Sequence, residues 1–282
     1  MYPIRFQPIE KTSVWGTESW EIADRPEGAT VVVNGPWQGK TLSDLMLEFG
    51  EILLGYPHSS FPLLIKRIYA KENLSVQVHP RETTGSEEAK SEAWVTLQKG
   101  TIYAGLKKGD LNGFRESIHK GTVEQVIEQH LLEAGEAIYI PGGSIHAIGA
   151  NSSLLEVQQN SNTTYRLYDW GRVGRELHLE KGFIAMRQEV MKKAVPVRID
   201  SYRERLIEAP YFQIDRVQIG DRYELICSSF QIIFCLKGEG VVEIGEFAER
   251  LEPEGFYFIS ANAHATVRGS SELLVIIPGY TV

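Results

Sequence analysis

The chain has 282 residues, 43% of them hydrophobic, which is enough for one large core or two smaller ones. Lys and Arg total 29 against 37 Asp and Glu, giving a formal net charge of -8 at pH 7. This acidic balance argues against nucleic acid or an anionic membrane as a partner, although a small anionic substrate would need only a local basic pocket.

The sequence also predicts where the protein works. The opening stretch MYPIRFQPIEKTSVWG lacks a charged segment followed by an apolar one, so we expect no signal peptide. No run approaches the roughly 18 apolar residues of a membrane span. Cys227 and Cys235 have neither metal-type spacing nor the pattern of a disulfide framework. We therefore expect a cytoplasmic protein.

Short runs rich in β-branched and aromatic residues, separated by glycine turns, dominate the chain and predict strands. In chain order they cover 61–70, 73–80, 92–109 with a turn at Lys99–Gly100, 135–143, 152–161, 163–171, 211–220, 223–229, 230–245, 255–267 and 272–279. Many short strands of this kind indicate an antiparallel barrel or a double-sheet jelly roll.

Helical periodicity is confined to three regions. Residues 40–55 predict a helix with Thr41 as its cap, and 177–190 predict a weaker one. Residues 111–132 predict two short helices, broken near Gly121, with Thr122 capping the second. The charge-rich segment 198–210 predicts a connection between two β units.

The segment LSVQVHP, residues 74–80, places two polar side chains on one face of a predicted strand. Because residues two apart on a strand share a face, Gln77 and His79 can reach the same ion. Glu92, at the start of the next predicted strand, would supply a third ligand. Taken alone, the pattern also fits an edge strand with solvated polar groups, and Glu92 alone would be a solvated charge.

The segment GEAIYIPGGSIHAIG adds a fourth candidate ligand. It reads as a strand, a tight Pro/Gly turn, and a second strand that opens with His146. This pattern resembles the second motif of the cupin superfamily of metal-holding jelly-roll barrels, and Gln77, His79 and Glu92 resemble the first. Two imidazoles, one carboxylate and one amide oxygen suit zinc, one ion per chain, with other divalent transition metals open.

A longer set of segments resembles the type I mannose-6-phosphate isomerases (phosphomannose isomerases) in their short prokaryotic form. The matching segments, in the family's order, are FPLLIKRIYAKENLSVQVHP, KSEAW, IYIPGGSIHAIG, LLEVQQNSNTTYRLYDWGR and RELHLEKG. The resemblance implies an aldose–ketose isomerase that interconverts mannose 6-phosphate and fructose 6-phosphate through an enediolate. It also implies that the four candidate ligands hold zinc.

The resemblance assigns roles to four charged residues that, without it, would be read as solvated or structural. Arg166 matches a catalytic arginine, and Lys66, Lys90 and Glu156 match positions that line the substrate pocket. The base that moves the proton between C1 and C2 stays open among Glu156, Lys90 and a metal-bound water. Lys66 or Arg166 would anchor the phosphate, unless Arg166 stabilises the oxyanion instead.

The strand pattern restarts near residue 211 and ends in a second cupin-like motif at His264, but no His or Gln pair precedes it. We therefore predict a mainly β protein of two cupin-type jelly-roll barrels with a few added helices. Residues 1–195 would form the metal-binding catalytic domain with helical insertions, and residues 196–282 a degenerate, metal-free domain.

The partner would be a small phosphorylated sugar. Whether a monomer or a homodimer binds it stays open, and so does the choice between this isomerisation and two alternatives. One alternative activity is isomerisation of another phosphosugar, such as glucose 6-phosphate. The other is a cupin that binds sugar without chemistry.

Overall fold

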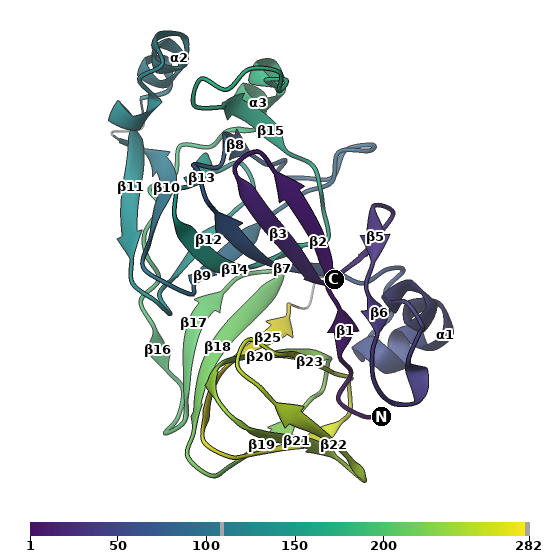
Figure 1. Cartoon of the computed structure of the whole chain (residues 1–282). Helices are drawn as coiled ribbons and strands as arrows, with labels where there is room; N and C mark the ends of the chain where they lie inside the picture. Colours follow the sequence, from purple (N-terminus) through teal and green to yellow (C-terminus); the bar gives the residue numbers. More distant parts are fainter. Residues whose placement is uncertain (108–109, 280–282) are drawn as a thin grey trace. The chain divides into compact units, whose positions relative to one another are not determined.

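The structure is a computed structural model that describes residues 1–107 and 110–279. The predicted mainly β fold is confirmed: antiparallel sheets dominate and helices are few (Figure 1). The chain divides into two compact units, unit 1 with residues 1–9, 20–64 and 195–282, and unit 2 with residues 10–19 and 65–194. Residues 1–9 and 20–64 thus group with the C-terminal part of the chain.

Unit 2 contains two sheets. The five-stranded sheet has the order β11-β10-β13-β8-β15, formed by Ile127–Leu132, Gly100–Leu106, His146–Ile148, Val76–Val78 and Tyr165–Tyr168. The six-stranded sheet has the order β12-β9-β14-β7-β3-β2, formed by Ala137–Ile140, Glu92–Thr96, Ser152–Gln159, Leu63–Ala70, Gly16–Ile22 and Ile9–Ser13. The strands β2, β3 and β7 cross the unit boundaries in the chain.

The two faces of the five-stranded sheet pack into different apolar clusters. On the inner face, Ile102 and Ile148 join Trp94 and Leu154 of the six-stranded sheet in one buried cluster, so the two sheets face each other. The outer face packs against helices α2 (Leu111–Lys120) and α3 (Leu179–Ala185). Since side chains alternate along a strand, the polar residues that share the inner face must lie in or beside this interior.

Helix α1 (Leu42–Leu54), in unit 1, begins and ends as the sequence predicts. Thr41 accepts a hydrogen bond from the Asp44 backbone N–H, and the Asp44 carboxylate accepts one from the Thr41 N–H, which makes a capping box. The helix stops at Gly55, whose φ of 91° is readily available only to glycine.

The second helix predicted within 111–132 is wrong. Helix α2 ends at Gly121 as expected, but Val123–Gln125 form only a 3₁₀ turn, η3, and residues 127–132 become strand β11. The backbone of β11 pairs with β10 along the edge of the sheet. This pairing is a non-local contact that overrides the local helical spacing of apolar residues.

The C-terminal part of unit 1 forms a second pair of sheets. The six-stranded sheet has the order β16-β17-β18-β25-β20-β23, formed by Val197–Arg198, Arg203–Glu208, Phe212–Ile219, Ser271–Pro278, Gln231–Gly238 and Phe256–Ile259. The four-stranded sheet has the order β19-β24-β21-β22, formed by Arg222–Ile226, His264–Arg268, Gly240–Ile244 and Phe247–Leu251. One apolar cluster fills the space between them with side chains such as Val217, Leu225, Ile233 and Val267.

Unit 1 has shorter elements near its N-terminus. They are the paired strands β1 (Phe6–Gln7) and β6 (Val31–Val32), the paired strands β4 (Asp24–Arg25) and β5 (Gly28–Ala29), and the 3₁₀ turn η1 (Gly35–Trp37).

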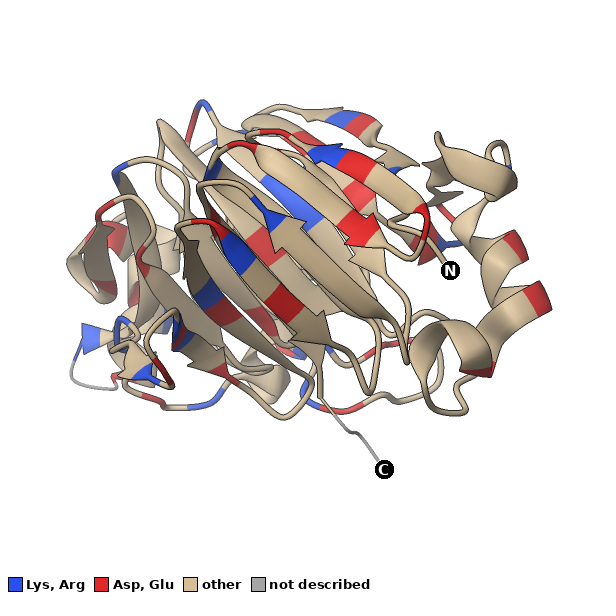
Figure 2. Ribbon diagram, turned by 90° about the horizontal axis from the view of Figure 1, so that it is seen from below, with Lys and Arg blue, Asp and Glu red and all other residues tan. Residues whose placement is uncertain are grey.

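The segment 198–210 is not the predicted connection, because it contains most of the β16–β17 hairpin. Its charges have partners on the neighbouring strand: Arg203 and Arg205 both pair with the buried Asp215. Figure 2 shows Lys or Arg beside Asp or Glu on adjacent strands, so the charge-rich composition reflects cross-strand pairing.

One predicted strand extends to residues that the structure does not describe. The predicted strand 92–109 is split at its expected turn into β9 and β10, and residues 108–109 lie outside the described residues.

Among the described helices, none is both long enough and apolar enough to cross a membrane.

Candidate metal and substrate site

Three predicted site residues form a row across the five-stranded sheet. His146 on β13 pairs with Gln77 on β8, and Gln77 pairs in turn with Arg166 on β15. Directly paired residues of antiparallel strands project from the same face. Gln77 therefore lies between a histidine and an arginine, an arrangement set by the strand register.

The facing sheet supplies the acidic and lysine side chains. Glu92 and Trp94 lie two residues apart on β9, and Trp94 pairs directly with Glu156 on β14. The next strand in the sheet, β7, carries Lys66, whose Nζ lies 3.0 Å from Glu156 Oε1. The two sheets thus present their polar rows toward each other.

A buried group that suits a metal ion forms where the two rows meet. His79 Nε2 lies 3.4 Å from Glu92 Oε2, and His146 Nε2 lies 3.3 Å from Glu92 Oε1. One ligand-type atom from each residue lies within 4.8 Å of the others. The side chains of His79, Glu92 and His146 are at most 1% exposed. Gln77 joins them through its amide nitrogen, 3.2 Å from His146 Nε2.

Two backbone carbonyls fix the orientation of the imidazole rings. His79 Nδ1 lies 2.9 Å from the carbonyl oxygen of Thr163, and His146 Nδ1 lies 2.9 Å from that of Ser144. Because a carbonyl oxygen only accepts hydrogen bonds, each Nδ1 must carry the hydrogen. Each Nε2 then presents its lone pair toward Glu92, as a metal ligand requires.

The protonation preferences of these groups also fit a cation. Burial, with Lys90 as the next cause, lowers the pKa of His79 to about 3, and burial lowers the pKa of His146. Burial alone would raise the pKa of Glu92, but Lys90 holds it well below its usual value. Among the described residues, His79 Nε2 and both Glu92 oxygens have no partner in a well-formed hydrogen bond. A divalent cation would satisfy all three atoms.

The metal-free protein is expected to lose stability as the pH falls. The unfolded chain binds protons on histidine near pH 6.5, whereas folded His79 resists protonation down to about pH 3, so acid favours unfolding throughout that window. The slope should be roughly 1.4 kcal/mol per pH unit for a fully buried histidine. Thermal unfolding in chelator at a series of pH values measures it. A His79→Gln variant should show a shallower decline, and an equal decline in both proteins would contradict the assignment.

A pocket of about 320 Å³ adjoins the metal group, and the predicted residues Lys66, Lys90, Glu156 and Arg166 line it together with Gln77. The structure therefore brings every predicted substrate residue to one place. Further lining residues that sequence reasoning gave no role are Ser13, Trp15, Glu18, Ile68, Leu74, Asn162, Thr164 and Arg175. Of these residues, Arg175 lies in the segment RELHLEKG, whose resemblance to the family was a signal in the sequence.

Charges alternate from the metal group along the pocket wall. Lys90 Nζ is 2.8 Å from Glu92 Oε2 and 3.9 Å from Glu156 Oε1. Lys66 follows, 3.0 Å from Glu156 Oε1 and 3.4 Å from Glu18 Oε2. Burial disfavours charge on Lys66, but Glu156 and Glu18 outweigh it and raise its pKa above the usual value. Lys66 is therefore cationic at neutral pH.

Arginines form another part of the pocket wall. The Arg166 Nη1 group donates to the carbonyl oxygen of Glu176 at 2.8 Å. Burial, followed by the nearby Arg175, lowers the pKa of Arg166, although it stays cationic. Asp169 accepts hydrogen bonds from Arg172 and Arg175, at 2.8 and 3.0 Å. Arg166 and Arg175 thus bring two guanidinium groups to the pocket, as an anion site needs.

Among the residues that the structure describes, the C-terminal sheets contain no equivalent group. His264 is exposed and its Nε2 lies 2.8 Å from Glu224 Oε2. In the portion of the chain that the structure covers, His79, Glu92 and His146 are the one cluster of metal-ligand type. We predict that His264→Ala leaves metal content unchanged, which metal analysis of the purified variant checks. Loss of metal in that variant would contradict a metal-free second barrel.

Two facing antiparallel sheets with an interior His/Glu/His group define a β-barrel protein with a site that suits a metal ion. A family model described as phosphomannose isomerase type I, catalytic domain, matches residues 6–121. Mannose-6-phosphate isomerase ManA of Bacillus subtilis (strain 168) is 30% identical over 283 residues, covering 87% of this chain and 89% of that protein. The chain therefore belongs to the type I phosphomannose isomerase family.

Solved structures share the fold over the full length. The crystal structure of a mannose 6-phosphate isomerase from Bacillus subtilis matches with a TM-score of 0.90 and 27% identity, covering 98% of this chain and 99% of that one. A mannose 6-phosphate isomerase solved with zinc and yttrium matches with a TM-score of 0.81 and 14% identity, covering 99% and 100%. At that identity the second match is evidence for the fold alone.

Proposed function

We propose that this protein interconverts mannose 6-phosphate and fructose 6-phosphate, with a divalent metal ion held by Gln77, His79, Glu92 and His146. The observation that carries this proposal is a single pocket whose lining residues Gln77 and Lys90 contact the buried metal-ligand group. The same pocket is lined by the cationic side chains of Lys66, Arg166 and Arg175. A phosphorylated sugar has hydroxyl and carbonyl oxygens that suit the metal-ligand group. It also has a phosphate dianion that suits the cationic side chains. The activities named for the family relatives support the same substrate.

Zinc is the ion we propose, because imidazole, carboxylate and amide ligands in a closed interior suit it. Gln77 would turn its amide oxygen toward the ion; oxygen and nitrogen of an amide exchange places by rotation about the last side-chain bond. When bound, zinc would act as a Lewis acid toward the sugar oxygens at C1 and C2.

Glu156 is the residue we assign as the base. Its Oε2 atom accepts a hydrogen bond from the Trp94 indole at 2.9 Å, and Glu156 as a whole lines the pocket. Oε1 is therefore the oxygen left to take the C2 proton of the open-chain aldose and return it to C1, while the hydroxyl proton on O2 passes to O1. Lys66 and Lys90 flank that oxygen and would stabilise the negative charge of the enediolate.

Arg166 and Arg175 are the residues we assign to the phosphate. The Arg166 guanidinium reaches the Glu176 carbonyl, and Arg175 lines the same pocket. This assignment favours phosphate binding over oxyanion stabilisation, the two roles between which the sequence left Arg166 open. Binding energy from the phosphate would orient the sugar for proton transfer.

A coupled assay of fructose 6-phosphate formation tests the proposal. The zinc-loaded protein should turn over mannose 6-phosphate, and chelator should abolish turnover. Unphosphorylated mannose should react far more slowly, because the arginines would lack their partner. Faster turnover of glucose 6-phosphate would identify a different phosphosugar isomerase. Binding of mannose 6-phosphate without turnover would identify a sugar-binding protein.

A further inference from the structure

We propose that residues 158–163 form a clasp that positions the metal site, with Ser161 and Thr163 as its positioning residues. This clasp belongs to the segment QQNSNTTYR, of which the proposed chemistry uses only the arginine. It contacts the His79 ring and binds the chain on both sides of Lys90, at Glu88 and at Ser91. The inference rests on the metal ligation proposed above and concerns how the ligands are held.

Thr163 connects two parts of the site through one residue. Its carbonyl oxygen, 2.9 Å from His79 Nδ1, fixes that ring. Its hydroxyl oxygen accepts a hydrogen bond from the backbone N–H of Glu88 at 3.1 Å. The Thr163 carbonyl that fixes the His79 ring therefore belongs to the same residue that holds the loop leading to Lys90 and Glu92.

Ser161 stabilises the turn formed by residues 161–163 through its buried hydroxyl. Its hydroxyl donates to the carbonyl oxygen of Glu88 at 3.0 Å and accepts from the Thr163 N–H at 3.3 Å. Ser161 is only 1% exposed, so these bonds do not compete with bulk water. Both backbone groups of Glu88 are thus bound by the clasp, which fixes the chain direction four residues before Glu92.

The first residues of the clasp, Gln158 and Gln159, bind the chain on the other side of Lys90. Gln158, on β14 opposite Glu92, is fully buried and donates from its amide to the Ser161 carbonyl oxygen at 2.6 Å. The Gln159 side-chain oxygen accepts from the Ser91 N–H at 2.8 Å. Metal affinity depends on such partners, because they hold the ligands in the geometry the ion needs.

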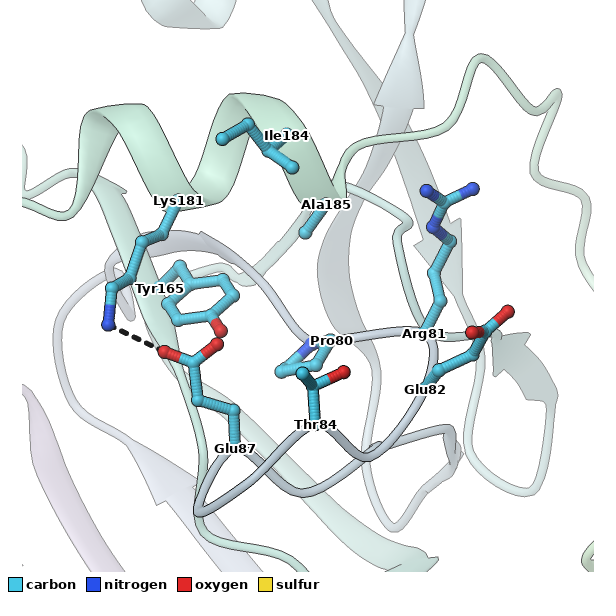
Figure 3. Close-up of a pocket in the computed structure, with 9 residues that line it drawn as sticks. All are labelled: Pro80, Arg81, Glu82, Thr84, Glu87, Tyr165, Lys181, Ile184 and Ala185. Carbon is cyan, nitrogen blue, oxygen red and sulfur yellow. Dashed lines mark hydrogen bonds and ion pairs between the residues drawn. The ribbon is translucent and has the colours of Figure 1, made fainter.

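The outer side of the same loop has a different kind of anchor, which supplies a control. Glu87 accepts from Lys181 of α3 at 2.5 Å, and Tyr165 lies against the same carboxylate, beside a hollow of about 330 Å³ (Figure 3). The Lys181 side chain is 62% exposed, so this ion pair is screened by solvent. The pair joins α3 to the loop and includes neither His79 nor a clasp residue.

The zinc dissociation constant, measured by competition with a chelating dye, tests the proposal without reference to turnover. We expect Thr163→Val, which removes the hydroxyl but keeps the shape, to weaken zinc binding roughly tenfold or more. Thr163→Ser keeps the hydroxyl and should bind zinc as the unchanged protein does. Lys181→Ala, which breaks only the outer anchor, should also leave the constant unchanged.

Three results would overturn the clasp. One is unchanged zinc affinity in Thr163→Val, a second is an equal loss in Lys181→Ala, and a third is absence of zinc binding by the unchanged protein. If Thr163→Val does not fold, Ser161→Ala tests the same hydrogen-bond set. Because zinc affinity is the readout, failure of the isomerase assay with normal zinc binding would count against the proposed function and not against the clasp.

Discussion

Replacing His146 with alanine is expected to remove bound zinc and nearly all isomerase activity. The imidazole is fully buried, with its Nδ1 hydrogen committed to the Ser144 carbonyl and its Nε2 directed at Glu92. Its removal takes away one proposed ligand and leaves Glu92 with one polar neighbour fewer. We expect zinc affinity to fall by about a hundredfold or more, since even partners outside the ligand set are worth 10–100-fold.

Metal analysis and the coupled assay together check this expectation. His264→Ala is the matched control, because among the described residues His264 has one acidic neighbour but belongs to no group of three metal-ligand residues. Zinc at high concentration should restore part of the activity of His146→Ala if the loss is one of affinity. Full zinc content and normal turnover in His146→Ala would show that the metal lies elsewhere.

Glu156→Gln should lower kcat by roughly three orders of magnitude while zinc content stays unchanged, because a general base contributes about 10²–10⁴-fold. The amide has the same shape and can still accept the Trp94 hydrogen bond through its oxygen. It cannot take a proton from C2. KM should change less than kcat, because the substitution removes a group used in proton transfer and leaves the arginines in place.

Exchange of the C2 hydrogen with deuterated solvent separates this role from a structural one. The unchanged enzyme should exchange the hydrogen during turnover, and Glu156→Gln should lose exchange and net isomerisation together. Glu18→Gln is a useful comparison, because Glu18 pairs with the same lysine on its other side. An equal loss of kcat in Glu18→Gln would indicate that the charge around Lys66 matters more than the base at Glu156.

The sequence predicted elements well where local chemistry defines them. The α1 helix follows its capping residues Thr41 and Asp44 and stops at Gly55. The prediction failed at residues 127–132, where the helical spacing of apolar residues gave way to pairing with β10. It failed again at 203–208, where a charged segment became strand β17 because its arginines meet Asp215 on the next strand.

The sequence alone was enough to identify the candidate metal ligands, because their signals are local. Gln77 and His79 share a strand face by the two-residue period, and a Pro/Gly turn precedes His146. Only the tertiary structure placed Glu92 between the histidines, brought Glu18 and Arg175 to the pocket, and joined Thr163 to His79. These relations depend on strand order and register, which arise from contacts between distant segments and leave no period in the sequence.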